Sequence, residues 1–266
     1  MKHRSLELSG LEKEDAVAYF QSLMKLPPEP QRVPPQRQKL LELFEMVQFH
    51  PLSIGLLANQ LKVRSATALG QRLEVLIAET PDNPLLASLN LSLERLDAEV
   101  RHWLPQLGVF QGGAMESELL QITEFSESQW QKLRPALEAT GLIQPEYLLN
   151  INVPYLKFHP TLAPALWLRL SESEQVVLLT RHRLRYYQLS HYLYVEDVKN
   201  PHFARATVQR ELPNLLYAVN SALDVGEEWA VEFVAIVNKF LDYFRLNRDR
   251  DALCQRAKQA DGAIGS

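Results

Sequence analysis

Glycine is scarce in this sequence, and this scarcity constrains the fold more than any other feature. Only ten of the 266 residues are glycine, whereas average usage of about 7% would give roughly nineteen. Tight turns, strand bulges and phosphate-binding loops all depend on glycine, because it adopts backbone angles that other residues avoid. We therefore expect a mainly α-helical protein, and not a sheet-rich fold or one with a glycine-rich nucleotide-binding loop.

The positions of the glycines are as informative as their number. A P-loop requires G-x-x-x-x-G-K-[S/T], because backbone N–H groups and a lysine must surround the phosphates. None of the ten glycines is followed by lysine, and the sequence contains no H-E-x-x-H zinc motif and no G-x-S-x-G serine motif. We therefore expect this chain to have no catalytic residues, no metal site and no enzymatic activity of its own.

Composition places the chain among ordinary globular proteins. Hydrophobic residues make up 46% and charged residues 23% of the sequence, which is typical of folded domains. No run approaches about 18 apolar residues, the length of a membrane span, and the N-terminus lacks the apolar run of a signal peptide. The single cysteine, Cys254, excludes a disulfide scaffold, and we expect it in a helical core. These features predict a cytoplasmic protein.

Residues 1–84 are predicted to form a four-helix domain. Apolar side chains recur at helical spacing over residues 11–25, 36–48, 51–61 and 65–77. Pro51 fits the first position of the third helix, where its missing N–H costs nothing. Ser9 is a candidate N-cap for the first helix, and the prolines between residues 27 and 35 indicate an extended loop.

Residues 85–164 are predicted to form a winged-helix domain. Helices are expected behind Asp97, over 115–122 and over 128–140, where Gly141 ends the last of them. Short β-like runs at 142–144 and 155–158 then flank a polar turn. Winged helices often bind DNA, but residues 85–158 carry five basic and nine acidic side chains. Because DNA binding requires several cations against phosphates, we do not expect DNA as a partner.

Residues 165–266 are predicted to be entirely helical. A long helix is expected over 173–195, followed by a helix pair over 203–224 and 229–246 and a further helix from residue 249. This spacing suggests tetratricopeptide-like (TPR-like) repeats of about 34 residues. Arg181 and Arg185 lie one turn apart in the long helix, where we expect a solvated or salt-bridged face. A phosphate or RNA contact is the alternative interpretation.

Five short motifs follow one another at residues 8–16, 49–54, 93–110, 158–162 and 211–219. In this order they resemble motifs of NB-ARC proteins, which belong to the STAND class of signalling ATPases. Residues 8–16 are similar to the opening of the helical lid, and 49–54 stand where that family has Gly-x-Pro-Leu. Residues 93–110 resemble the start of the family's winged helix. Residues 158–162 occupy the place of its Met-His-Asp motif, and 211–219 resemble the opening of the TPR-like array that commonly follows.

The resemblance implies two nucleotide contacts. In that family the lid proline packs on adenine, and the winged-helix histidine reaches the β-phosphate of bound ADP. Pro51 and His159 are the matching positions in this chain. The sequence departs from the pattern around both, because His50 precedes Pro51, and Phe158 and Pro160 flank His159 where methionine and aspartate are expected.

The resemblance also implies how the whole chain functions. The P-loop core is missing, so the chain corresponds to the C-terminal portion of a longer ATPase whose core would precede residue 1. It is expected to hold no cofactor alone, whereas the parent binds ADP or ATP and can oligomerise when active. A protein partner would bind the helical repeats, and no membrane is involved. The alternative is a stand-alone TPR-like adaptor without nucleotide chemistry.

Overall fold

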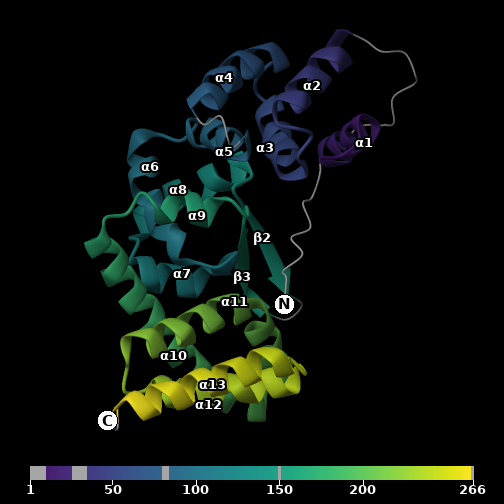
Figure 1. Cartoon of the computed structure of the whole chain (residues 1–266). Helices are drawn as coiled ribbons and strands as arrows, with labels where there is room; N and C mark the ends of the chain where they lie inside the picture. Colours follow the sequence, from purple (N-terminus) through teal and green to yellow (C-terminus); the bar gives the residue numbers. More distant parts are fainter. Residues whose placement is uncertain (1–9, 26–34, 80–83, 149–150, 265–266) are drawn as a thin grey trace. The chain divides into compact units, whose positions relative to one another are not determined.

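The computed structural model describes residues 10–25, 35–79, 84–148 and 151–264 (Figure 1). Over these residues the protein is mainly helical, with thirteen α-helices, one 3-10 helix and one three-stranded antiparallel sheet. The expectation of a mainly α fold is therefore confirmed. Ser9 and most of the predicted proline loop lie outside the described residues.

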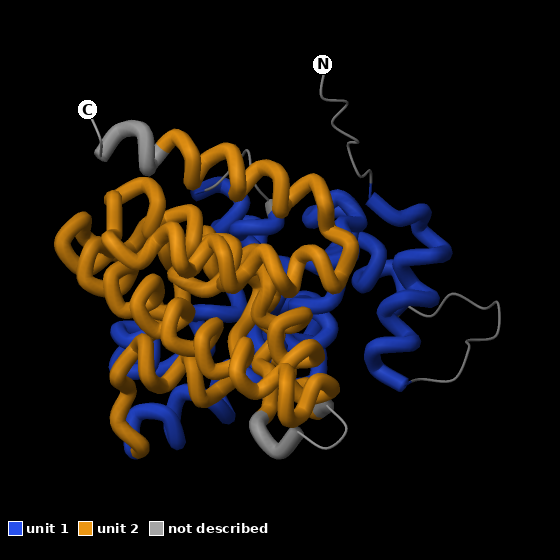
Figure 2. The backbone as a smooth tube through the Cα atoms, turned by 90° about the horizontal axis from the view of Figure 1, so that it is seen from below, with its two compact units in different colours: residues 1–103, 128–143 blue, residues 104–127, 144–266 orange. Residues whose placement is uncertain are grey.

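The chain divides into two compact units, which Figure 2 shows in different colours. Unit 1 comprises residues 1–103 and 128–143, and unit 2 comprises residues 104–127 and 144–266. The boundary expected at residue 84 falls inside unit 1, and the expected segment 85–164 contributes to both units. The three domain ranges drawn from the sequence stay predictions.

Unit 1 is a cluster of helices around one apolar core. Its helices are α1 (Lys13–Met24), α2 (Pro35–Met46), α3 (Pro51–Leu61), α4 (Ala66–Glu79), α5 (Pro84–Leu93), α6 (Ala98–Trp103) and most of α8 (Glu127–Thr140). Phe20 of α1, Phe44 of α2, Leu57 of α3 and Leu73 of α4 are all buried in this core. The four helices predicted for residues 1–84 are present, and α5 packs on α3 and α4.

A close backbone approach sets the geometry before α3. Gly10 lies against the carbonyl group of Gln48 with no room for a Cβ atom. The N–H of Leu11 donates to the carbonyl oxygen of Phe49 at 3.0 Å. Gln48 and Phe49 both have positive φ angles, so the chain turns sharply into His50 and Pro51. Glycine at position 10 is therefore required where the start of α1 touches this turn.

Unit 2 begins with a small sheet and the short helices around it. Its first elements are η1 (Leu104–Val109), β1 (Gly113–Met115), α7 (Glu116–Thr123), β2 (Ile143–Leu148), β3 (Ile151–Phe158) and α9 (Leu162–Trp167). The strand order is β1-β3-β2, and Gly113 pairs with Lys157 while Met115 pairs with Tyr155. β2 and β3 correspond to the predicted hairpin, whereas β1 and α9 were not predicted from the sequence.

Four long helices complete unit 2. They are α10 (Glu172–Lys199), α11 (Pro201–Val225), α12 (Ala230–Tyr243) and α13 (Asn247–Ile264). Each of these helices packs on the next one in the chain. In addition, α10 contacts α12, and α11 contacts α13. Gly226 ends α11 with a φ of 71°, as expected for the junction of a helix pair. Cys254, expected in a helical core, lies half-buried in α13 and accepts a hydrogen bond from Asn238 at 3.2 Å.

Candidate functional site

The two residues singled out by the family resemblance lie in different compact units. Pro51 occupies the first position of α3 in unit 1, behind His50 as the N-cap residue. His159 directly follows β3 in unit 2, and its carbonyl oxygen accepts the N–H of Leu162 at 2.9 Å. Its ring Nδ1 lies 2.8 Å from the hydroxyl of Thr161. The predicted helix start at Pro51 is confirmed, and His159 is held in the turn before α9.

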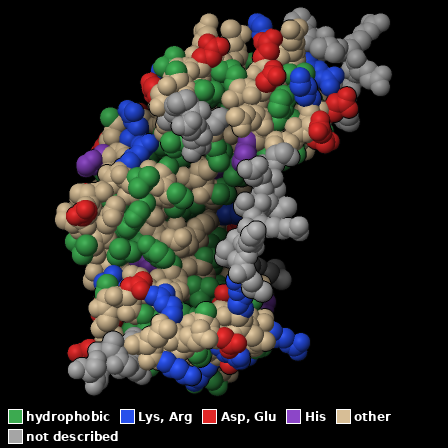
Figure 3. Space-filling model, in the orientation of Figure 1, with side chains coloured by type: hydrophobic (Ala, Val, Ile, Leu, Met, Phe, Trp, Pro, Cys, Tyr) green, Lys and Arg blue, Asp and Glu red, His purple; other side chains and the backbone are tan. Residues whose placement is uncertain are grey.

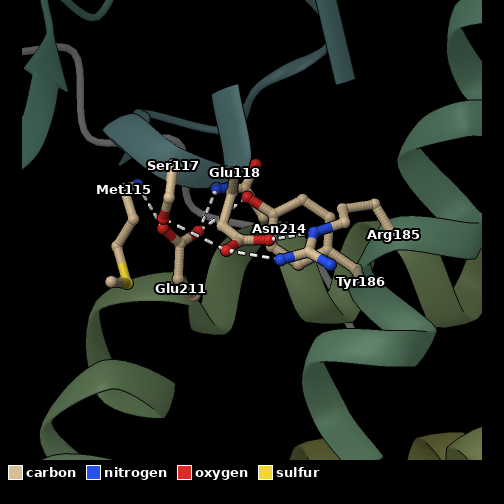
Figure 4. Close-up of polar contacts among 7 residues, drawn as sticks. All are labelled: Met115, Ser117, Glu118, Arg185, Tyr186, Glu211 and Asn214. Atoms are coloured by element: carbon tan, nitrogen blue, oxygen red, sulfur yellow. Dashed lines mark hydrogen bonds and ion pairs between the residues drawn. The ribbon is translucent and has the colours of Figure 1, made fainter. Parts of the chain in front are cut away.

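The strongest concentration of buried polar groups lies elsewhere, on α11 (Figure 4). Glu211 and Asn214 are one helical turn apart, and both are fully buried. The carboxylate of Glu211 accepts the backbone N–H of Met115, the hydroxyl of Tyr186 at 2.7 Å and the amide of Asn214 at 2.9 Å. Side chains from α11 and α10 therefore meet the end of β1 inside unit 2.

Asn214 holds the chain just before this point. Its Oδ1 accepts the backbone N–H of Gln111 at 2.7 Å, and its amide donates to the carbonyl oxygen of Gly113 at 2.7 Å. Together Asn214 and Glu211 bind three backbone groups between residues 111 and 115. We call Glu211, Asn214 and Tyr186, with the backbone they bind, the α11 latch. It fastens α10 and α11 to β1.

Arginines of α10 extend this contact to α7. Arg185 forms a bidentate pair with Glu118 at 2.6 and 3.0 Å, and the side chain of Glu118 is only 4% exposed. Arg181 pairs with Glu124 at 2.6 Å. The salt-bridged face expected for Arg181 and Arg185 is confirmed, although their partners lie in and directly after α7 and not in the helical array.

Burial dominates the electrostatics of Glu211. It raises the pKa of the carboxyl to about 7, against the opposing effect of the hydrogen bonds from Met115, Tyr186 and Asn214. The negative charge of Glu118 raises it further. Burial likewise raises the pKa of Tyr186 well above its usual value. The α11 latch thus contains a carboxyl group, that of Glu211, whose charged form is disfavoured by its surroundings.

His182 is the second buried titratable group of this region. It is fully buried, with ring centroids 4.5 Å from Tyr186, 5.6 Å from Tyr217 and 5.9 Å from Phe110. Neither ring nitrogen has a well-aligned hydrogen-bond partner. Burial lowers the pKa of His182 to about 3, and the charge of Arg183 acts in the same direction, whereas the nearby Asn214 amide opposes it. His182 therefore stays neutral in the folded protein.

Complete burial limits what this cluster can do chemically. Glu211, Asn214 and His182 expose no surface, so a substrate cannot reach them, and we interpret the α11 latch as a structural connection. Neither the family models nor the curated proteins match this chain. Its function must therefore be argued from its own residues.

Clustered acidic and histidine side chains would hold a metal ion, and unpaired cations would face DNA phosphates. No group of three or more His, Cys, Asp or Glu side chains among the described residues could hold a metal ion. In α8, the helix over 128–140 of the expected winged helix, Lys132 pairs with Glu99 at 3.0 Å and Arg134 with Glu138 at 2.8 Å. Figure 3 shows positive and negative side chains intermingled on the visible face.

Among the described helices, none combines the length and the apolar character that a membrane span requires.

Sequence reasoning missed the α11 latch, although a signal was present. Residues 211–219 were noted only as the opening of a helical array. Glu211 and Asn214 share a helix face with the buried apolar residues Val208, Leu215 and Ala218. Two polar residues on an otherwise apolar stripe indicate buried hydrogen bonding, because polar groups are buried only when they are paired.

Proposed function

We propose that this chain is the regulatory and protein-interaction portion of a STAND-class signalling ATPase of the NB-ARC type. In this proposal residues 1–84 form the helical lid, 85–164 the winged helix and 165–266 a TPR-like array. The lid and winged helix close over ADP in the intact parent, with Pro51 against the adenine and His159 against the β-phosphate. The array responds to a protein partner and shifts the balance between resting and active states.

The α11 latch is the observation that carries this proposal. Glu211 and Asn214 attach α11 to β1, and β1 pairs along β3, which ends immediately before His159. The array helices and the turn that bears His159 thus belong to one hydrogen-bonded body, unit 2. A partner that displaces α10 or α11 would pull on β1 and, through β3, on His159.

The test uses the parent protein that carries a P-loop core. ADP affinity is measured by titration calorimetry for wild type, His159→Ala and the control His191→Ala, whose ring contacts Glu232 at the surface of α10. Loss of a charge-assisted contact to phosphate should weaken ADP binding about tenfold in His159→Ala. His191→Ala should bind ADP as wild type does. Unchanged affinity in both variants would refute the role of His159.

The second candidate is a stand-alone adaptor, and a row of exposed apolar side chains on α10 favours it. Val177, Leu184, Val195 and Val198 are 50%, 45%, 54% and 87% exposed. They follow one another at intervals close to whole helical turns, so they share one face. Arg181, Gln188 and His191 lie between them on the same face, so the apolar side chains form an interrupted row. Exposed apolar side chains on one helix face are a surface that a protein partner would cover. The adaptor hypothesis predicts that no P-loop is encoded upstream of residue 1 and that partner binding is unaffected by ADP.

A further inference from the structure

A cavity in unit 1 takes no part in the function proposed above. It has a volume of about 460 Å³ and lies among α1, α2, the end of α3 and the start of α4. Pro51 begins α3, whereas this cavity is lined by Leu61 at the other end of that helix. The eleven residues of α3 span roughly 16 Å at 1.5 Å per residue. The cavity is therefore separate from the residue matched to the adenine contact.

The walls of the cavity are mainly aliphatic. Val17 and Phe20 of α1 are only 6% and 7% exposed, and Met24, Leu40 and Leu61 are partly buried beside them. Phe20 already packs against Phe44, with ring centroids 5.6 Å apart. A surface of this kind suits a flexible alkyl chain better than a flat nucleotide base, which is usually held by stacking on aromatic rings.

The rim of the cavity carries only positive charge. Arg37, Lys39 and Arg64 line it, and no acidic residue does among the described residues. The Nε of Arg37 is buried without a hydrogen-bond acceptor, and a buried donor left unpaired costs about 1–3 kcal/mol. Lys39 donates to the hydroxyl of Thr67 at 3.2 Å. Among the described residues no carboxylate lines the cavity beside these cations, although the charge of Arg64 reaches Glu94 and lowers the pKa of that carboxyl. An anionic ligand would supply the missing partner inside the cavity.

The start of α4 adds to this preference for anions. Ser65, Ala66 and Thr67 line the cavity, and α4 is a 14-residue helix that begins at Ala66. Unpaired N–H groups give the first turn of a helix a partial positive charge that attracts anions. In the region of α1 and α2, Figure 3 shows Lys and Arg side chains beside apolar ones, with Asp and Glu side chains around them.

We propose that this cavity binds a medium-chain aliphatic carboxylate. The alkyl chain lies on Val17, Phe20 and Leu40, and the carboxylate accepts hydrogen bonds from Arg37 and Arg64. The volume of about 460 Å³ equals that of about fifteen water molecules in the liquid. This space accommodates a twelve-carbon chain with its carboxylate.

The test measures binding of dodecanoate to the full chain by titration calorimetry, below the concentration at which micelles form. Octanoate should bind at least tenfold more weakly, because each buried methylene contributes about 0.8 kcal/mol. Dodecanol, which has the same chain without the charge, should bind about tenfold more weakly. Equal binding of dodecanoate and dodecanol would overturn the proposal, as would tighter binding of ADP or of an acidic peptide that displaces dodecanoate.

Two variants locate the site. Arg37→Gln/Arg64→Gln should weaken dodecanoate binding at least tenfold. The matched control Arg248→Gln/Lys258→Gln removes the same charge from exposed positions of α13 and should bind as wild type does. Arg64 is at an exposed position, so Arg64→Gln alone should fold normally, and its affinity for dodecanoate should fall about threefold. Unchanged affinity in either cavity variant, with folding verified by circular dichroism, would overturn the assignment.

Discussion

The carboxylate of Glu211 accepts the hydroxyl hydrogen bond of Tyr186 at 2.7 Å, between two helices of unit 2. His182 lies one turn before Tyr186 on α10, with the two ring centroids 4.5 Å apart. Burial acts on the two titratable groups in opposite directions, because it raises the pKa of the Glu211 carboxyl and lowers that of the His182 imidazole. Their contributions to stability therefore oppose each other as pH changes.

Glu211→Gln should make stability rise with pH. The pKa of Glu211 in the folded protein, about 7, is above the ordinary value of 4.5, so Glu211 stabilises the fold most below pH 4.5, and this stabilisation is lost as pH rises to 7. In Glu211→Gln only His182 is left, of these two groups, to make stability depend on pH. The pKa of His182 is about 3 in the folded protein, against an ordinary value of 6.5. The free energy of unfolding of the variant should therefore rise by about 3 kcal/mol between pH 4.5 and 6.5. Urea unfolding across this pH range measures the rise. In wild type the opposing contributions of Glu211 and His182 should leave the profile flat, and an equally flat profile for the variant would contradict the prediction.

His182→Phe should reverse this dependence. Phenylalanine keeps an aromatic ring against Phe110 and Tyr217 and removes two poorly paired ring nitrogens, so the cost in unfolding free energy near pH 6.5 should be small. With only Glu211 left, stability should fall by about 3 kcal/mol from pH 4.5 to 7. The double variant His182→Phe/Glu211→Gln is the control, and it should show neither slope in the same urea experiment.

Arg185→Ala should destabilise far more than a comparable surface change. It leaves the nearly buried carboxylate of Glu118 without its bidentate partner, and breaking a buried pair costs about 3–5 kcal/mol. Lys132→Ala breaks a pair with Glu99 in which both side chains are more than half exposed, so it should cost about 0–1 kcal/mol. Chemical unfolding of both variants checks this difference, and equal losses would show that Glu118 finds another partner.

Gly108→Ala should separate η1 from α9. A Cβ atom at residue 108 would lie 2.6 Å from the backbone nitrogen of Trp167, so the two segments must shift at a cost of about 1–3 kcal/mol. Gly70→Ala in α4 is the matched control, because nothing lies within 4 Å of its added methyl group. It should stabilise by up to about 1 kcal/mol. Thermal unfolding distinguishes the two, and a stable Gly108→Ala protein would contradict this packing.

Local sequence patterns determined most of the helices. Apolar residues at helical spacing, with Gly141 and Gly226 as terminators, predicted helices close to their observed bounds, because an amphipathic helix needs only one apolar face and a local stop signal. Strand β1 has three residues and no alternating pattern, so nothing local indicates it. It exists because Gly113–Met115 pairs with β3, and the paired residues are 40 to 44 positions apart in the sequence.

The same limit applies to the candidate sites. From the sequence, Arg181 and Arg185 could be assigned to one helix face, but the carboxylates that pair with them come from α7 and the residue after it. Glu211 reads locally as an ordinary helix carboxylate, yet it is fully buried against Met115 and Tyr186. Periodicity reports which side of a helix is apolar, whereas burial and hydrogen-bond partners depend on which elements pack together. The sequence by itself therefore determined a helical chain without a P-loop, and only the tertiary structure decided that Glu211 and Asn214 join the helical array to the sheet.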